Sequence, residues 1–155
     1  MRSTCDFLAG EMKSLRPVVQ PLRADGRGCL NVAAMPGAGG LTTHVLDVAR
    51  GRPAAGVAIA LVRLRDGAHA ETVAEAVTNA DGRTDAPLVA PGDLAAGTYE
   101  LRFAVGAYFR ATGATHGEPP FLDVVPVRFG ISAPGEHHHV PLLVSPWSYS
   151  TYRGS

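Results

Sequence analysis

The chain is short of cysteine and has no surplus of charge of either sign. Among its 155 residues are two cysteines, and 14 Lys plus Arg balance 14 Asp plus Glu. Without a basic surplus or a long basic run, binding to nucleic acid or to an anionic membrane surface is disfavoured. Cys5 and Cys29 are too few for a disulfide framework, so two free thiols in a reducing compartment are the favoured interpretation.

Long apolar runs are also missing. No stretch approaches the roughly 20 apolar residues that span a bilayer. The N-terminal sequence MRSTCDFLAGEMKSLRP carries Asp6 and Glu11 where the apolar region of a secretory signal peptide would lie. We therefore expect a cytoplasmic protein with no membrane partner.

The sequence changes character near residue 40. Residues 1–40 combine one short helix-like stretch with Pro, Gly and Arg in no periodic order, which predicts a flexible N-terminal extension. Residues 41–155 contain short runs of alternating apolar residues separated by turn signals, a pattern typical of an all-β sandwich or barrel. We therefore expect an extension over 1–40 and one domain over 41–155, without internal repeats.

About seven or eight strands are expected in this domain, arranged as a Greek-key sandwich. GTYELRFAV and FLDVVPVRFGI alternate clearly between apolar and other residues. Residues 106–118 lack this alternation and contain a stop signal at Gly113, so the one short helix is expected there. Pro126 and Pro141 fall inside two expected strands. Because proline cannot donate to a strand ladder, each should mark an edge, a bulge or a break.

Six histidines raise the question of a metal site. His137 and His139 are two residues apart and would project from one face of a strand, and with His44 they would make a three-histidine zinc site. No Cys, Asp or Glu is placed to complete a structural site, and a solvated strand face is favoured for His137 and His138. His44 shares a strand face with apolar residues, where a partly buried imidazole needs a partner. Taken alone, it is interpreted as a structural histidine.

Three stretches together resemble the transthyretin-like 5-hydroxyisourate hydrolases: LTTHVLD at 41–47, ADGRTD at 80–85, and HVPLLVSPWSYSTYRGS at 139–155. The terminal Tyr-Arg-Gly-Ser is the specific part, since it distinguishes these hydrolases from hormone-carrying transthyretins. The resemblance implies a transthyretin-like (prealbumin-like) all-β sandwich of about eight strands with one short helix. It also implies an enzyme of urate breakdown that converts 5-hydroxyisourate to 2-oxo-4-hydroxy-4-carboxy-5-ureidoimidazoline without a metal or other cofactor.

The resemblance carries the family's site onto specific residues of this chain. The implied catalytic residues are His44, Arg83, His139 and Ser155. The implied substrate-binding residues are His44, Arg83, Tyr152, Arg153, Gly154 and Ser155. The two histidines would activate water and move protons, and Arg83 would grip substrate oxygens and stabilise negative charge. The Ser155 hydroxyl and carboxylate would orient a histidine or bind a substrate N–H, and the charged carboxylate near His139 or His44 would raise that histidine's pKa.

The resemblance also implies a homotetramer, a dimer of dimers, with paired sites in a channel at the dimer–dimer interface. Arg83 beside the histidines would repel a divalent cation, which weighs against a metal. The alternative function is a transthyretin-like carrier that binds a small ligand in the same channel without catalysis. A carrier needs apolar channel walls, whereas His44, Arg83 and His139 would make these walls polar and cationic. A non-catalytic interaction module would leave the terminal motif without a role.

Overall fold

The computed structural model describes residues 39–65, 70–114 and 117–154. The expected extension up to residue 38, with Cys5 and Cys29, lies outside the described residues, as does Ser155. The described part contains these strands and one helix: β1 (Gly40–Thr42), β2 (Val45–Asp47), β3 (Arg52–Pro53), β4 (Ala58–Leu64), β5 (Ala70–Val77), β6 (Gly97–Phe103), α1 (Val105–Ala111), β7 (Val125–Ile131), β8 (His137–His139), β9 (Leu142–Ser145) and β10 (Ser148–Thr151). In this part, the single helix is too short to cross a membrane.

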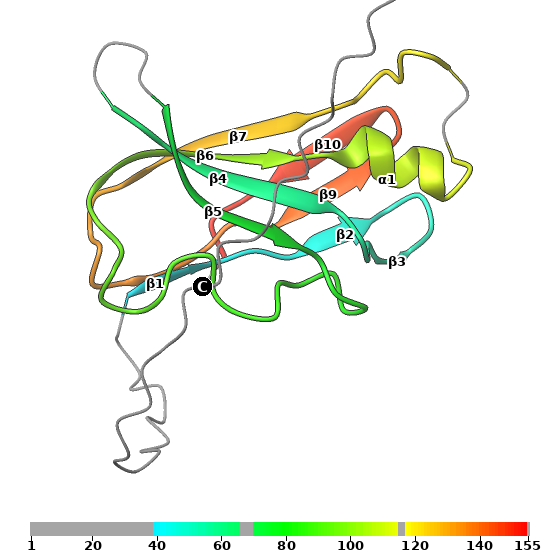
Figure 1. Cartoon of the computed structure of the whole chain (residues 1–155). Helices are drawn as coiled ribbons and strands as arrows, with labels where there is room; N and C mark the ends of the chain where they lie inside the picture. The colour runs from blue at the N-terminus through cyan, green and yellow to red at the C-terminus, as the bar shows by residue number, and fades with distance from the viewer. Residues whose placement is uncertain (1–38, 66–69, 115–116, 155) are drawn as a thin grey trace, which may run out of the picture. The chain divides into compact units, whose positions relative to one another are not determined.

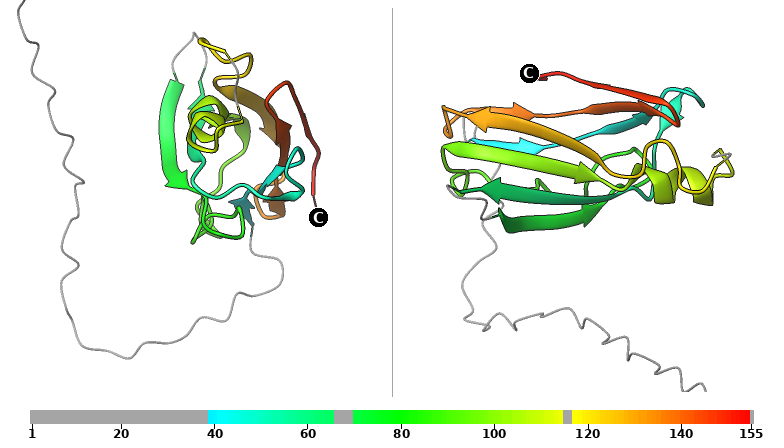
Figure 2. Two further views of the ribbon diagram at one scale, coloured as in Figure 1. Left: turned by 90° about the vertical axis from the view of Figure 1, so that its right-hand side faces the viewer. Right: turned by 90° about the horizontal axis from the view of Figure 1, so that it is seen from above.

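The strands form two facing sheets, with α1 at one end of the sandwich (Figures 1 and 2). One sheet has the order β5-β4-β6-β7 and is antiparallel throughout. The other has the order β10-β9-β2-β3. Strands β1 and β8 form a separate pair, and in the chain they directly precede β2 and β9. Both β1–β8 and β2–β9 pair in parallel. The expected mostly-β architecture with one short helix is confirmed, and the transthyretin-like fold follows from structural relatives described below.

The core lies between the sheets and follows the predicted alternation. Leu101 and Phe103 on β6 and Val125 on β7 are fully buried, and Val127 is nearly so. Burying each such side chain contributes about 1.5–3 kcal/mol relative to exposing it. The helix ends as expected before Gly113, whose φ of 68° lies in the left-handed region that favours glycine.

The two prolines that interrupt expected strands have different outcomes. Pro126 lies in β7, which is the edge strand of its sheet. Pro141 separates β8 from β9 and so breaks one expected strand in two. The amides on either side of this break still bond across the ladder, since Val140 N–H donates to the Thr42 carbonyl at 3.0 Å and Leu142 N–H to the His44 carbonyl at 2.8 Å. The chain therefore keeps one parallel pairing on both sides of Pro141.

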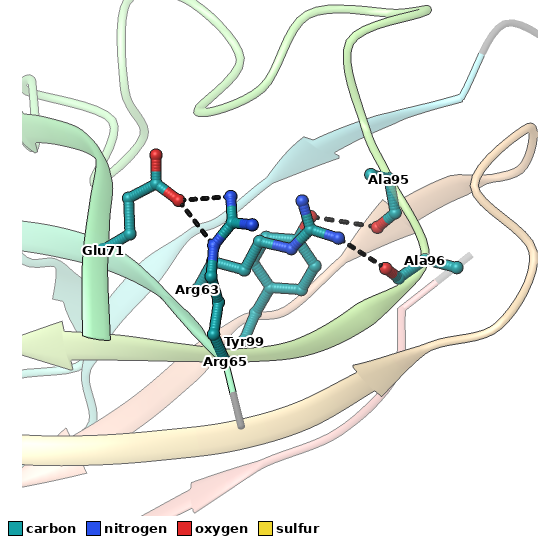
Figure 3. Close-up of polar contacts among 6 residues, drawn as sticks. All are labelled: Arg63, Arg65, Glu71, Ala95, Ala96 and Tyr99. Atoms are coloured by element: carbon teal, nitrogen blue, oxygen red, sulfur yellow. Dashed lines mark hydrogen bonds and ion pairs between the residues drawn. The ribbon is translucent and has the colours of Figure 1, made fainter. Parts of the chain in front are cut away.

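The start of β6 is fixed by a small polar cluster within its own sheet, β5-β4-β6-β7 (Figure 3). The Tyr99 hydroxyl donates to the Ala95 carbonyl at 2.9 Å, and Arg63 Nη2 donates to the Ala96 carbonyl at 2.9 Å. The Arg63 guanidinium also lies 5.7 Å from the centre of the Tyr99 ring. These contacts tie the preceding loop to the sheet, so this cluster stabilises the scaffold away from the histidines.

Candidate functional site

A tight turn places Arg83 against the strand segment that carries His44. Asn79 N–H donates to the Arg83 carbonyl at 2.7 Å, and Gly82 adopts a φ of 70°. A Cβ at Gly82 would collide with the Val45 carbonyl oxygen, so glycine is needed here for space as well as for its backbone conformation. The Gly82 carbonyl accepts from Val45 N–H at 2.8 Å, and His44 and Arg83 form an antiparallel bridge. The expected Asn-Ala-Asp-Gly turn therefore brings the arginine to the histidine.

His139 lies between β1 and the C-terminal segment. The parallel register of β1 and β8 sets Thr42 opposite His139, and Thr42 Oγ1 is 2.9 Å from His139 Nδ1. On the other side, Gly154 N–H donates to the His139 carbonyl at 2.9 Å. A Cβ on Gly154 would lie 2.6 Å from His139 Cδ2. The absence of a side chain at Gly154 is therefore what lets the C-terminal segment lie against the imidazole.

The two nitrogens of the His44 ring differ in their surroundings. The backbone of Asp81 acts on the ring and raises the pKa of His44. The Nε2 atom is buried and meets no hydrogen-bond partner among the described residues. In the tautomer with its hydrogen on Nδ1, the ring presents a free lone pair at Nε2. An unpaired buried polar atom costs about 1–3 kcal/mol, which a water or ligand at Nε2 would recover.

The surroundings of both site histidines favour the neutral imidazole. Burial, followed by the positive charge of Arg83, lowers the pKa of His44 below its ordinary value of 6.5. The same two causes, with smaller effects from His137 and His44, lower the pKa of His139. The rise in pKa expected from the terminal carboxylate depends on Ser155, which lies outside the described residues. Among the described residues, the net effect is to hold both imidazoles ready to accept a proton.

The terminal residues are less closely grouped than the resemblance implied. Tyr152 and Arg153 are exposed, and Arg153 Nη2 forms an ion pair with Glu136 Oε2 at 2.7 Å. Together with His139 they line a pocket of about 280 Å³. Arg83 lines a separate hollow of about 140 Å³ together with Thr42. The chain thus brings together His44, Arg83, His139 and Gly154, while the side chains of Tyr152 and Arg153 lie toward a neighbouring pocket.

The three consecutive histidines have different environments. His137 is exposed and lies with Nε2 3.1 Å from Thr42 Oγ1. The solvated face expected for His138 is wrong: its side chain is buried, with Nε2 3.0 Å from the Ala133 carbonyl oxygen. It points inward because neighbours on a strand alternate and His137 and His139 occupy the outer face. Within the described residues, no group of three or more His, Cys, Asp or Glu side chains is arranged to hold a metal ion.

Two groups that act on the site histidines were not predicted from the sequence, the Thr42 hydroxyl and the backbone of Asp81. Thr42 precedes His44 by two residues, so its place on the same strand face was a usable signal. The backbone of Asp81 has no sequence signal, because any residue would supply the same carbonyl. His44 is half-buried, as expected, on the face that it shares with Leu46 and the exposed Val48, whereas the fully buried face of this segment carries Thr43 and Val45.

Comparison with known proteins identifies relatives over most of the chain. The sequence model of the HIUase/Transthyretin family matches residues 41–154. A 5-hydroxyisourate hydrolase of Deinococcus radiodurans is 59% identical over 121 residues, which cover 78% of this chain and 100% of that protein. The solved Klebsiella pneumoniae 5-hydroxyisourate hydrolase is 40% identical with a TM-score of 0.62, covering 75% of this chain and 99% of that one. Sea bream transthyretin in complex with thyroxine is 30% identical with a TM-score of 0.66, and the match covers 74% of this chain and 93% of that one.

Proposed function

Because the chain belongs to the HIUase/Transthyretin family, we propose that it opens the ring of 5-hydroxyisourate with a water molecule activated by His44 and with charge stabilisation by Arg83. Two relatives, 59% and 60% identical to this chain, are 5-hydroxyisourate hydrolases. The assignment of roles rests on one observation: His44 Nε2 is buried without a hydrogen-bond partner among the described residues and lies beside the positive charge of Arg83.

The proposed reaction begins with a water held at His44 Nε2. As the water oxygen bonds to a ring carbonyl carbon of the substrate, the imidazole takes the water proton. The carbonyl oxygen gains negative charge, which the Arg83 guanidinium stabilises with its planar set of donors. The carbon–nitrogen bond of the ring amide then breaks, and the leaving nitrogen receives a proton from His139. The product carries a new carboxyl group and a ureido group, as in 2-oxo-4-hydroxy-4-carboxy-5-ureidoimidazoline.

Arg83 has a second effect in this scheme. Its charge is a cause of the lowered pKa of both histidines, so it keeps His44 in the neutral form that can act as a base. A group that both stabilises the oxyanion and maintains the base should be costly to remove. No step requires a metal or organic cofactor.

The proposal extends to assembly and location. We propose a cytoplasmic homotetramer, a dimer of dimers, in which each site is completed at an interface between subunits. Two observations support an interface near the C-terminal segment. Tyr149 and Tyr152 expose large apolar surfaces there, and the hollow at Arg83, at about 140 Å³, is small and open in the single chain. The carrier alternative is not favoured, since the residues gathered here are two imidazoles and a guanidinium.

The test is optical. Urate and urate oxidase generate 5-hydroxyisourate, and the protein should accelerate the decay of its ultraviolet absorbance. His44→Ala and Arg83→Ala should each lower kcat/KM by about 10²–10³-fold. Arg52→Ala, at an exposed position on β3, is the matched control and should keep wild-type activity. Near-normal turnover by Arg83→Ala would contradict the assigned roles, and a wild-type protein that does not accelerate the decay would favour the carrier.

A further inference from the structure

Three side chains form a hydrogen-bonded line at the pairing of β1 with β8. Thr42 Oγ1 lies 2.9 Å from His139 Nδ1 and 3.1 Å from His137 Nε2. His137 and His139 project from the same face of β8 because they are two residues apart, and the register sets Thr42 opposite His139. His137 is exposed, whereas His139 is half-buried and faces the candidate site. The line therefore runs from the surface of the chain to an imidazole of the site.

The chemistry of a hydroxyl group gives this line a direction. A threonine hydroxyl has one hydrogen to donate and two lone pairs that accept. With a ring nitrogen on either side, its hydrogen can point at one imidazole while its oxygen accepts from the other. In that arrangement one of the facing nitrogens carries a hydrogen and the other does not. The tautomers of His137 and His139 are thus coupled through Thr42, although the imidazoles do not bond one another directly.

We propose that Thr42 is a positioning residue that sets the tautomer of His139 and, with His137, relays a proton from outside the site to His139. This inference rests on the proposed function, because it concerns the proton that His139 gives to the leaving nitrogen. In the resting arrangement His137 Nε2–H donates to Thr42, and the Thr42 hydroxyl donates to His139 Nδ1. His139 then carries its own hydrogen on Nε2.

The relay balances its protons. When His139 Nε2–H passes to the leaving nitrogen, Nδ1 takes the hydroxyl hydrogen of Thr42, and the hydroxyl oxygen takes the Nε2 hydrogen of His137. His139 stays neutral throughout and only changes tautomer. His137 is exposed, and its Nδ1 takes a proton from solvent as Nε2 gives one up, so this ring loses no net proton. The proton that His44 removed from water is released separately, so each turnover adds one water to the substrate.

The surroundings of His139 favour proton transfer through Thr42 over an imidazolium form of His139 that already carries the proton. Burial and the charges of Arg83, His137 and His44 all disfavour an imidazolium at this position. A neutral His139 cannot give up a proton repeatedly unless its other nitrogen gains one in the same step. Thr42 is the side chain placed on that nitrogen.

The test compares two substitutions at one position. Thr42→Val removes the hydroxyl and keeps the side-chain shape, and it should lower kcat about 10–100-fold with KM little changed. Thr42→Ser keeps the hydroxyl and should recover most of that loss. Thr72→Val, the same substitution at an exposed position on β5, controls for the change of residue type and should keep wild-type kcat. His137→Gln should also lower kcat, and combining it with Thr42→Val should add little, because both interrupt one relay.

A second readout does not depend on turnover. Nitrogen-15 NMR of the imidazoles should show His139 protonated on Nε2 in the wild type and a changed tautomer population in Thr42→Val. The relay is refuted if Thr42→Val keeps wild-type kcat or if Thr42→Ser is as impaired as Thr42→Val. It is also refuted if the losses of kcat in Thr42→Val and His137→Gln multiply in the double variant. A fully active His139→Ala variant would instead refute the proposed role of His139, and the relay with it.

Discussion

Gly154→Ala tests whether the C-terminal segment positions the imidazole of His139. The new Cβ would lie 2.6 Å from His139 Cδ2 and 3.2 Å from Cβ and Cγ of the same residue. Ordinary contact between carbon atoms needs about 3.5–4.0 Å, so the ring or the chain end must move by about 1 Å. Among the described residues, one hydrogen bond, from Gly154 N–H to the His139 carbonyl, joins the two, so the movement will be shared between them.

The magnitude follows from the sensitivity of catalysis to position. A displacement of about 1 Å in a catalytic group can cost about 10²-fold in rate. We therefore expect Gly154→Ala to lower kcat by about 10–100-fold. Stability should change little, because Gly154 does not belong to the buried core and its φ is not in the left-handed region.

The assay is the decay of 5-hydroxyisourate absorbance, with thermal unfolding measured on the same preparations. Gly130→Ala is the matched control, since a Cβ at Gly130 meets no atom within 4 Å and its backbone is not strained. The control should keep both activity and melting temperature. If Gly154→Ala is as active as Gly130→Ala, the contact of the C-terminal segment with His139 does not position the catalytic ring.

The remaining predictions concern pH and stability. Because the neutral imidazole is the active base and the pKa of His44 is lowered from 6.5, kcat/KM should fall only as pH drops below about 6.5, and Arg83→Gln should move this acid limb to higher pH in a pH–rate profile. An unmoved limb would exclude Arg83 as a cause of the lowered pKa. Tyr108→Phe removes a 2.9 Å hydrogen bond to the fully buried Asp47 carboxylate, which should cost about 1.5–3 kcal/mol of unfolding free energy in urea titration without changing kcat. Unchanged stability would show that Asp47 finds another donor.

Local patterns predicted those elements whose causes are local. The alternation of β6 and β7 identified their buried faces, and Gly113 marked the end of the helix. The Asn-Ala-Asp-Gly sequence predicted the turn before Arg83, because its side-chain and glycine requirements are fulfilled within four residues.

Features that depend on distant residues were not predictable in the same way. The alternation of β6 places Glu100 on the face opposite Leu101 and Phe103, yet its side chain is buried because Arg102 and Arg128 hydrogen-bond its carboxylate. The contact of Thr42 with His139 depends on a parallel pairing between strands 97 residues apart. The resemblance to known hydrolases named the site residues, but it did not supply these hydrogen bonds.

The uninterrupted register across Pro141 limits how this sequence can change by insertion and deletion. Thr42 faces His139 and Val45 faces Leu142, so the same offset of 97 residues holds on both sides of the break. Removing or adding one residue in either segment would turn His44 or His139 to the opposite face of its strand. Point substitutions at the surface leave this alignment intact. Length variation among descendants of this gene should therefore accumulate in the connections between strands and spare residues 42–45 and 139–142.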